Sequence, residues 1–93
     1  MAQILQIHAL VSGYVQGVNF RYYTQIHAKK LGLTGFVRNM ADGRVEVVAQ
    51  GSREQLERMV EWLHNGPASA AVEDVAVEWH KPGKKFKGFS IAR

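Results

Sequence analysis

The residues whose types and spacing could do chemistry are concentrated at positions 13–21, in the run GYVQGVNFR. Gly17 can adopt a positive φ angle, which lets consecutive backbone N–H groups turn inward and form a concave nest for an anion. If a helix begins after this run, its free N–H groups and the positive end of its dipole face the same place. Arg21 would then lie in the first helical turn, where its guanidinium can hold two phosphate or carboxylate oxygens. The run therefore predicts an anion-binding site.

Taken alone, however, this run has a simpler interpretation, which is a tight connection that carries a surface arginine. The local pattern by itself favours that interpretation over a site. The run lacks the Gly-Lys-Ser/Thr ending of nucleoside triphosphate loops, and it does not match the dinucleotide-binding glycine pattern. The choice between a surface arginine and an anion site therefore depends on other residues.

The remaining chemistry-bearing side chains form no recognisable site. The sequence has no cysteine, which excludes disulfides, thiolate metal ligands and a cysteine nucleophile. Its four histidines form no metal-binding array, and His27 fits a packed position on an apolar helix face. We therefore expect no metal. Two groups of charged residues are interpreted as solvated surface: Glu54, Glu57 and Glu61, and the cluster Lys81, Lys84, Lys85 and Lys87. The lysine cluster could also steer an anionic substrate.

A strand and a helix are predicted on either side of the run that contains Gly17. Residues 3–11 are rich in Ile, Leu and Val, which is typical of a buried strand, and Ser12-Gly13-Tyr14 is predicted to end it. Apolar side chains recur at helical spacing over residues 20–31, and Gly32 is suited to cap that helix. The run therefore joins a strand to a helix.

The rest of the chain predicts a hairpin, a second helix and further strands. Asp42-Gly43 is a strong signal for the hairpin turn. Ser52 and Gln55 form a capping box at the start of the second helix, and Asn65-Gly66-Pro67 ends it. The predicted strands of this part are residues 34–40, 44–50, 72–80 and 86–91.

The predicted order is strand, helix, strand, strand, helix, strand and a short final strand. This βαββαβ order indicates an α+β, ferredoxin-like α/β sandwich, in which two helices cover one face of a mostly antiparallel sheet. Because this fold serves many unrelated functions, it does not by itself indicate an activity.

Length and composition predict a single small domain that spans residues 1–93. The chain is 46% hydrophobic and 22% charged, which is an ordinary globular balance. Its net charge of +4 weakly favours anionic partners. No apolar run approaches the ~20 residues of a membrane helix, and the N-terminus lacks the basic segment of a signal peptide. We therefore expect a cytoplasmic protein.

Two segments together resemble the acylphosphatase family. Residues 13–21 resemble its signature, which is a glycine, any residue, Val-Gln-Gly-Val, any residue and Phe-Arg. Residues 32–39, GLTGFVRN, resemble its second motif, Gly-hydrophobic-x-Gly-aromatic-Val-basic-Asn. The resemblance covers nearly the whole chain. Further agreement is found at residues 42–47, Gly51, residues 65–67 and residues 88–91.

This resemblance implies hydrolysis of acyl phosphates to a carboxylate and inorganic phosphate, without a metal or cofactor. Arg21 stands where the family has its phosphoryl-binding arginine, and Asn39 stands where it has the asparagine that orients the attacking water. Met40 follows where some members have a small or polar residue, which leaves the fine positioning of the water open. The resemblance also implies a substrate-binding loop, made of Val15, Gln16, Gly17, Val18, Asn19 and Phe20.

Two other functions remain as alternatives to an acyl phosphate hydrolase. Some RNA-binding domains share this order of elements, but residues 87–91 match only the beginning of their aromatic motif. The second alternative is a catalytically idle domain that keeps the phosphate site, and the presence of both Arg21 and Asn39 argues against it. We expect a small-molecule acyl phosphate as the partner, no nucleic acid or membrane, and a monomer.

Overall fold

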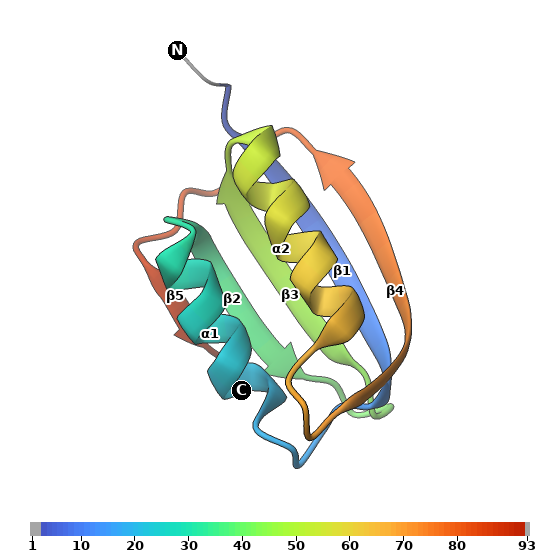
Figure 1. Ribbon diagram of the computed structural model, residues 1–93. Coiled ribbons are helices and arrows are strands. Elements are labelled where there is room, and N and C mark those ends of the chain that lie inside the picture. The colour runs from blue at the N-terminus through green and yellow to red at the C-terminus, as the bar shows by residue number, and fades with distance from the viewer. Residues whose placement is uncertain (1–2, 93) are drawn as a thin grey trace.

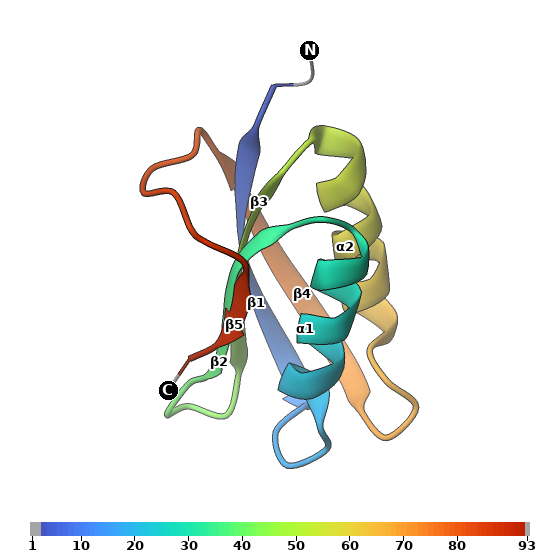
Figure 2. The same cartoon turned by 90° about the vertical axis from the view of Figure 1, so that its left-hand side faces the viewer.

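The computed structural model describes residues 3–92, which form a five-stranded sheet and two helices. The elements are β1 (Leu5–Tyr14), α1 (Phe20–Lys30), β2 (Thr34–Asn39), β3 (Val45–Gly51), α2 (Arg53–Asn65), β4 (Ala71–His80) and β5 (Phe89–Ile91). Both helices cover one face of the sheet (Figure 1) and leave the other face free of helices (Figure 2). The strand order is β4-β1-β3-β2-β5, and among the strands of residues 3–92 only β5 pairs in parallel, with β2. The predicted ferredoxin-like α+β fold is confirmed.

Helix α2 begins and ends where the sequence predicts. Ser52 N donates to Gln55 Oε1 at 2.8 Å and Gln55 N donates to Ser52 Oγ at 3.2 Å, which closes the capping box. Gly66 caps the other end at a φ of 65°. A Cβ atom at Gly66 would lie 2.9 Å from a ring carbon of Phe20. A glycine here therefore allows both the turn and the close packing of this helix end against the start of α1.

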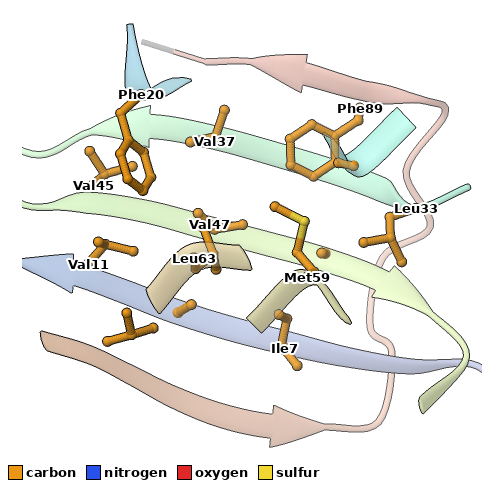
Figure 3. Close-up of a cluster of buried hydrophobic side chains, with 14 of the residues drawn as sticks. Ile7, Val11, Phe20, Leu33, Val37, Val45, Val47, Met59, Leu63 and Phe89 are labelled. Atoms are coloured by element: carbon orange, nitrogen blue, oxygen red, sulfur yellow. The ribbon is translucent and has the colours of Figure 1, made fainter. Parts of the chain in front are cut away.

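The core lies between the two helices and the sheet (Figure 3). Ile7, Val11 and Val37 point from the sheet and are fully buried, and Phe20 from α1 is buried in the same cluster. Burial of a side chain of this size stabilises the fold by roughly 1.5–3 kcal/mol. Helix α2 and strand β3 add Leu56, Met59, Leu63, Val45 and Val47. The core thus fixes the start of α1 against the sheet.

Strand β1 continues beyond its predicted end. It runs through Ser12-Gly13-Tyr14 and pairs there with β4, with a shift of register between Ser12 and Gly13. Gly13 has a φ of 122°, and a Cβ atom there would meet Ala71 O at 2.3 Å. The prediction that these residues break the strand is wrong, because the glycine accommodates a bulge within the strand.

The last strand is shorter than the predicted residues 86–91. Gly88 takes a φ of 70°, which interrupts the extended backbone, and β5 begins only at Phe89. Phe86 lies outside the strand and packs edge-on against Phe36, with 5.8 Å between the ring centroids. The segment between β4 and β5 therefore crosses the sheet face that the helices leave open (Figure 2).

Helix α1 packs through one face, as its periodicity predicts. Phe20, Thr24 and Ala28 are buried, and Thr24 Oγ1 donates to Phe20 O at 2.8 Å. His27 is packed against Trp62, with 4.6 Å between the ring centroids. Burial, followed by the nearby charge of Lys30, lowers the pKa of His27. Within residues 3–92, neither helix is long and apolar enough to cross a membrane.

Candidate active site

A cavity of about 250 Å³ lies at the end of the sheet where α1 begins. The connection between β1 and α1, the first turn of α1, the last residue of β2 and the end of β5 meet there (Figure 1). Its lining residues are Val15, Gly17, Asn19, Phe20, Arg21, Tyr22, Asn39 and Ile91. The cavity therefore brings together side chains from distant parts of the sequence.

The backbone of the β1–α1 connection contains two residues in the left-handed region. Gly17 has a φ of 77°, and Asn19 caps α1 in the left-handed region with a φ of 63°. The helix ladder begins with Tyr23 N, which donates to Asn19 O at 3.1 Å. The N–H groups just before Tyr23 are therefore not used by the ladder, and no acidic residue lies in the first turn of α1. Free N–H groups and the helix dipole both favour an anion here.

Arg21 and Asn39 reach this cavity from two different elements. Arg21 is partly buried in the first turn of α1, and Asn39 is the last residue of β2, paired with Val45 of β3. Asn39 alternates with buried Val37, so its side chain lies on the helix side of the sheet. Asn39 Oδ1 is buried and has no hydrogen-bond partner among residues 3–92. This amide can therefore accept a hydrogen bond from a molecule in the cavity.

Most of the predicted site residues line the cavity, but two do not. Val15, Gly17, Asn19, Phe20, Arg21 and Asn39 are lining residues. Val18 is only 7% exposed and belongs to the hydrophobic core. The side chain of Gln16 is directed to the β2–β3 connection, where Nε2 donates to Met40 O at 2.8 Å and to Arg44 O at 2.9 Å.

Sequence reasoning missed three residues that shape the cavity. Tyr22 and Ile91 line it, with exposed fractions of 54% and 40%. Ser69 Oγ donates to Val18 O at 2.7 Å and so ties the β1–α1 connection to the segment before β4. Tyr22 could have been found from its place beside Arg21. No local sequence signal marks Ser69 or Ile91, because both are distant from the loop in sequence and the tertiary fold brings them to the site.

The ionised groups nearest in sequence to Asn39 lie outside the cavity. Burial alone would raise the pKa of Glu46, but hydrogen bonds from His8 and Arg38 outweigh burial and lower it. A side-chain hydrogen bond from Arg44 lowers the pKa of Asp42 in the β2–β3 turn. In the part of the chain that the structure describes, no three His, Asp or Glu side chains are grouped to hold a metal ion. Among the described residues that line the cavity, Arg21 carries the charge that is offered to a ligand.

A model of the family described as Acylphosphatase matches residues 7–91 of this chain. The chain belongs to the acylphosphatase family. The acylphosphatase of Trichormus variabilis is 51% identical over 92 residues, which cover 99% of this chain and 90% of that relative. The resemblance of the two motifs to acylphosphatases is thereby confirmed.

Solved acylphosphatases also share the fold. The crystal structure of the acylphosphatase from Bacillus subtilis superposes with a TM-score of 0.93 at 40% identity, and the match covers 96% of this chain and 99% of that one. The acylphosphatase from Coxiella burnetii gives a TM-score of 0.91 at 40% identity, covering 97% and 94%. The sheet and both helices therefore belong to the acylphosphatase architecture.

Proposed function

We propose that this member of the acylphosphatase family hydrolyses acyl phosphates to a carboxylate and inorganic phosphate. The observation that carries the proposal is the cavity in which an anion-binding helix start, the Arg21 guanidinium and the Asn39 amide meet. Backbone N–H groups from Gln16 to Phe20 and the Arg21 side chain bind the phosphoryl group. Asn39 orients the attacking water.

The chemistry suits this small set of groups. An acyl phosphate is a mixed anhydride, so its leaving group is a weakly basic carboxylate that needs no strong general acid. The water oxygen bonds to phosphorus, and the bond from phosphorus to the acyl oxygen breaks, with its electron pair leaving on the carboxylate. Phosphoryl transfer depends mainly on positioning and on stabilisation of charge. Arg21 and the loop amides supply that stabilisation at the phosphoryl oxygens.

The proton of the attacking water passes to a phosphoryl oxygen in this proposal. Among the described residues that line the cavity, none is a His, Asp or Glu that could serve as a base. Asn39 can donate and accept hydrogen bonds but does not take up a proton. A pH–rate profile that requires an enzyme group titrating near neutrality would contradict this step.

The proposal includes the organisation of the protein. Residues 1–93 form one acylphosphatase domain that acts as a monomer in the cytoplasm, without a metal or cofactor. Sedimentation or light scattering at assay concentration tests the monomer, and a dimer would contradict it. A cavity of about 250 Å³ is small, which agrees with a site that holds the phosphoryl group and little more of the substrate.

Hydrolysis of benzoyl phosphate, followed by ultraviolet absorbance with EDTA present, tests the function. Arg21→Lys keeps the charge but loses the planar fork, and Asn39→Ala removes the amide. Loss of one oriented catalytic group commonly lowers turnover by ~10²–10³. We expect fast hydrolysis by the wild type and a loss of that size in both variants, with circular dichroism confirming that they are folded.

The same assay tests the idle-domain alternative. A folded wild type that binds inorganic phosphate and does not hydrolyse benzoyl phosphate would contradict the proposed enzyme. Hydrolysis that persists in both variants would instead contradict the roles given to Arg21 and Asn39.

A further inference from the structure

The side chain of Gln16 connects the two segments that form the cavity. Gln16 lies between Val15 and Gly17, which both line the cavity. Its Nε2 donates to Met40 O at 2.8 Å and to Arg44 O at 2.9 Å, and Met40 directly follows Asn39. One amide group thus joins the β1–α1 connection to both sides of the β2–β3 turn.

This contact uses the whole donor capacity of the Gln16 amide. A side-chain amide carries two N–H donors, and each meets a backbone carbonyl here. Met40 N also donates to Arg44 O at 2.8 Å, so Gln16 closes onto a turn that is already paired. The paired turn lies on one side of the cavity, and the two hydrogen bonds of Gln16 hold the β1–α1 connection to it.

The other anchors of the loop hold it against different parts of the protein. Val15 and Val18 are buried in the core, and Ser69 Oγ binds Val18 O at 2.7 Å. These contacts maintain the shape of the loop. The Ser69 bond holds the loop to the segment before β4, whereas Gln16 contacts the residue that follows Asn39.

We propose that Gln16 is a positioning residue that sets the spacing between the phosphate loop and Asn39. This inference rests on the proposed function. Gln16 acts through Met40 and Arg44, because its side chain does not line the cavity. Displacement of a reacting group by about 1 Å can lower the rate by ~10², so a contact that fixes this spacing affects turnover strongly.

Gln16→Glu tests the proposal, because it keeps the shape of the side chain and replaces the amide donor with a carboxylate. That carboxylate faces two carbonyl oxygens, which repel its charge and raise its pKa. Gln55→Glu is the matched control. Gln55 Nε2 also donates to a backbone carbonyl, Leu31 O at 2.7 Å, but at the opposite end of α1.

We expect Gln16→Glu to lower kcat for benzoyl phosphate about 10- to 100-fold at pH 7. In Gln16→Met, which removes the donor without adding a charge, kcat should also fall while the inhibition constant of inorganic phosphate stays within about twofold, because the loop amides and Arg21 are retained. As pH falls from 7 to 5, protonation of Glu restores a donor, so kcat of Gln16→Glu should recover relative to the wild type. Gln55→Glu should keep wild-type kcat at every pH.

An unchanged kcat in Gln16→Glu would overturn the inference. Parallel loss of kcat and phosphate affinity without recovery in acid would overturn it too, since that result describes a damaged loop. If Gln16→Glu does not fold, Gln16→Met removes the donor without adding charge. The inference then requires a lowered kcat and an unchanged phosphate affinity in Gln16→Met. Wild-type turnover in the same assay reports separately on the proposed function.

Discussion

Asn39 Oδ1 is buried without a hydrogen-bond partner among residues 3–92, in the cavity that the Arg21 side chain also lines. The two residues come from different elements, Arg21 from the start of α1 and Asn39 from the end of β2. A buried amide oxygen that lacks a partner destabilises a fold, because it has lost its hydrogen bonds to water. This arrangement is understandable if Asn39 serves a molecule held beside Arg21, and its effect on stability can be measured.

Asn39→Ala should separate stability from activity. Removal of an unpaired buried amide relieves its desolvation penalty, so we expect the free energy of unfolding to stay equal to that of the wild type or rise by ~1 kcal/mol. Turnover of benzoyl phosphate should fall by ~10²–10³ in the same variant. Urea denaturation and kinetics on one preparation provide both numbers. A loss of more than about 1 kcal/mol of stability would show that Asn39 supports the fold.

The left-handed conformation of Asn19 should be sensitive to side-chain shape. Asn tolerates a φ of 63°, glycine tolerates it better, and a β-branched residue does not. We expect Asn19→Val to lose about 1–2 kcal/mol of stability and most phosphate affinity, because the loop amides are redirected. Asn19→Gly should retain both within a small factor. Equal phosphate affinity in the Val and Gly variants, measured by calorimetry, would argue against an amide nest at this position.

Stability should fall in acid through Glu46. Because hydrogen bonds from His8 and Arg38 lower the folded-state pKa of this carboxylate, the unfolded chain binds its proton more readily. The Glu46 contribution is therefore complete above the ordinary pKa of about 4.5 and is lost as pH falls through the lowered value. Glu46→Gln should show a shallower decline of the melting temperature below about pH 4.5 than the wild type.

Exposed Glu61 is the control for this measurement, since it lies on α2 away from His8 and Arg38. Glu61→Gln should reproduce the wild-type decline of melting temperature in acid. If Glu46→Gln and the wild type decline in parallel, the contacts of Glu46 do not contribute to stability.

Tyr22 and Ile91 form the exposed apolar part of the cavity wall, so they are available to contact the acyl group of the substrate. Apolar contacts of this kind commonly change specificity by about tenfold or more in a closed pocket, and by less on an open wall. We expect Ile91→Ser to lower kcat/KM for benzoyl phosphate about three- to tenfold and to leave acetyl phosphate nearly unchanged. Ile4→Ser, at an exposed isoleucine outside this cavity, is the control. An equal loss for both substrates would mean that Ile91 acts on the phosphoryl site.

The fold could be predicted because its strongest signals are local. The Ser52–Gln55 capping box, the Asp42-Gly43 turn and the helical spacing that starts at Phe20 each depend on neighbouring residues. The predictions that are wrong concern residues whose conformation depends on tertiary contacts. The sequence predicts a break in the strand at Gly13. In the structure Ala71 of β4 lies against Gly13, and the strand continues through a bulge.

The residues of the candidate site also fall into two groups, those that a local run of sequence indicates and those that the fold brings to the site. The loop and Arg21 form one continuous run, so their proximity follows from the sequence. Ile91 comes to this region through the parallel pairing of β5 with β2. Ser69 comes to it from the segment before β4, through its hydrogen bond to Val18 O. The part played by the Gln16 side chain also depends on the fold, because its two acceptors belong to the hairpin turn.

The most direct test of the central claim is hydrolysis of benzoyl phosphate in water enriched in oxygen-18, with mass analysis of both products. A phosphoryl group held by the loop and Arg21, with water directed by Asn39, is attacked at phosphorus. The account therefore predicts one labelled oxygen in the inorganic phosphate and none in the benzoate. Label in the benzoate would place the attack at the carbonyl carbon and contradict the roles assigned to Arg21 and Asn39.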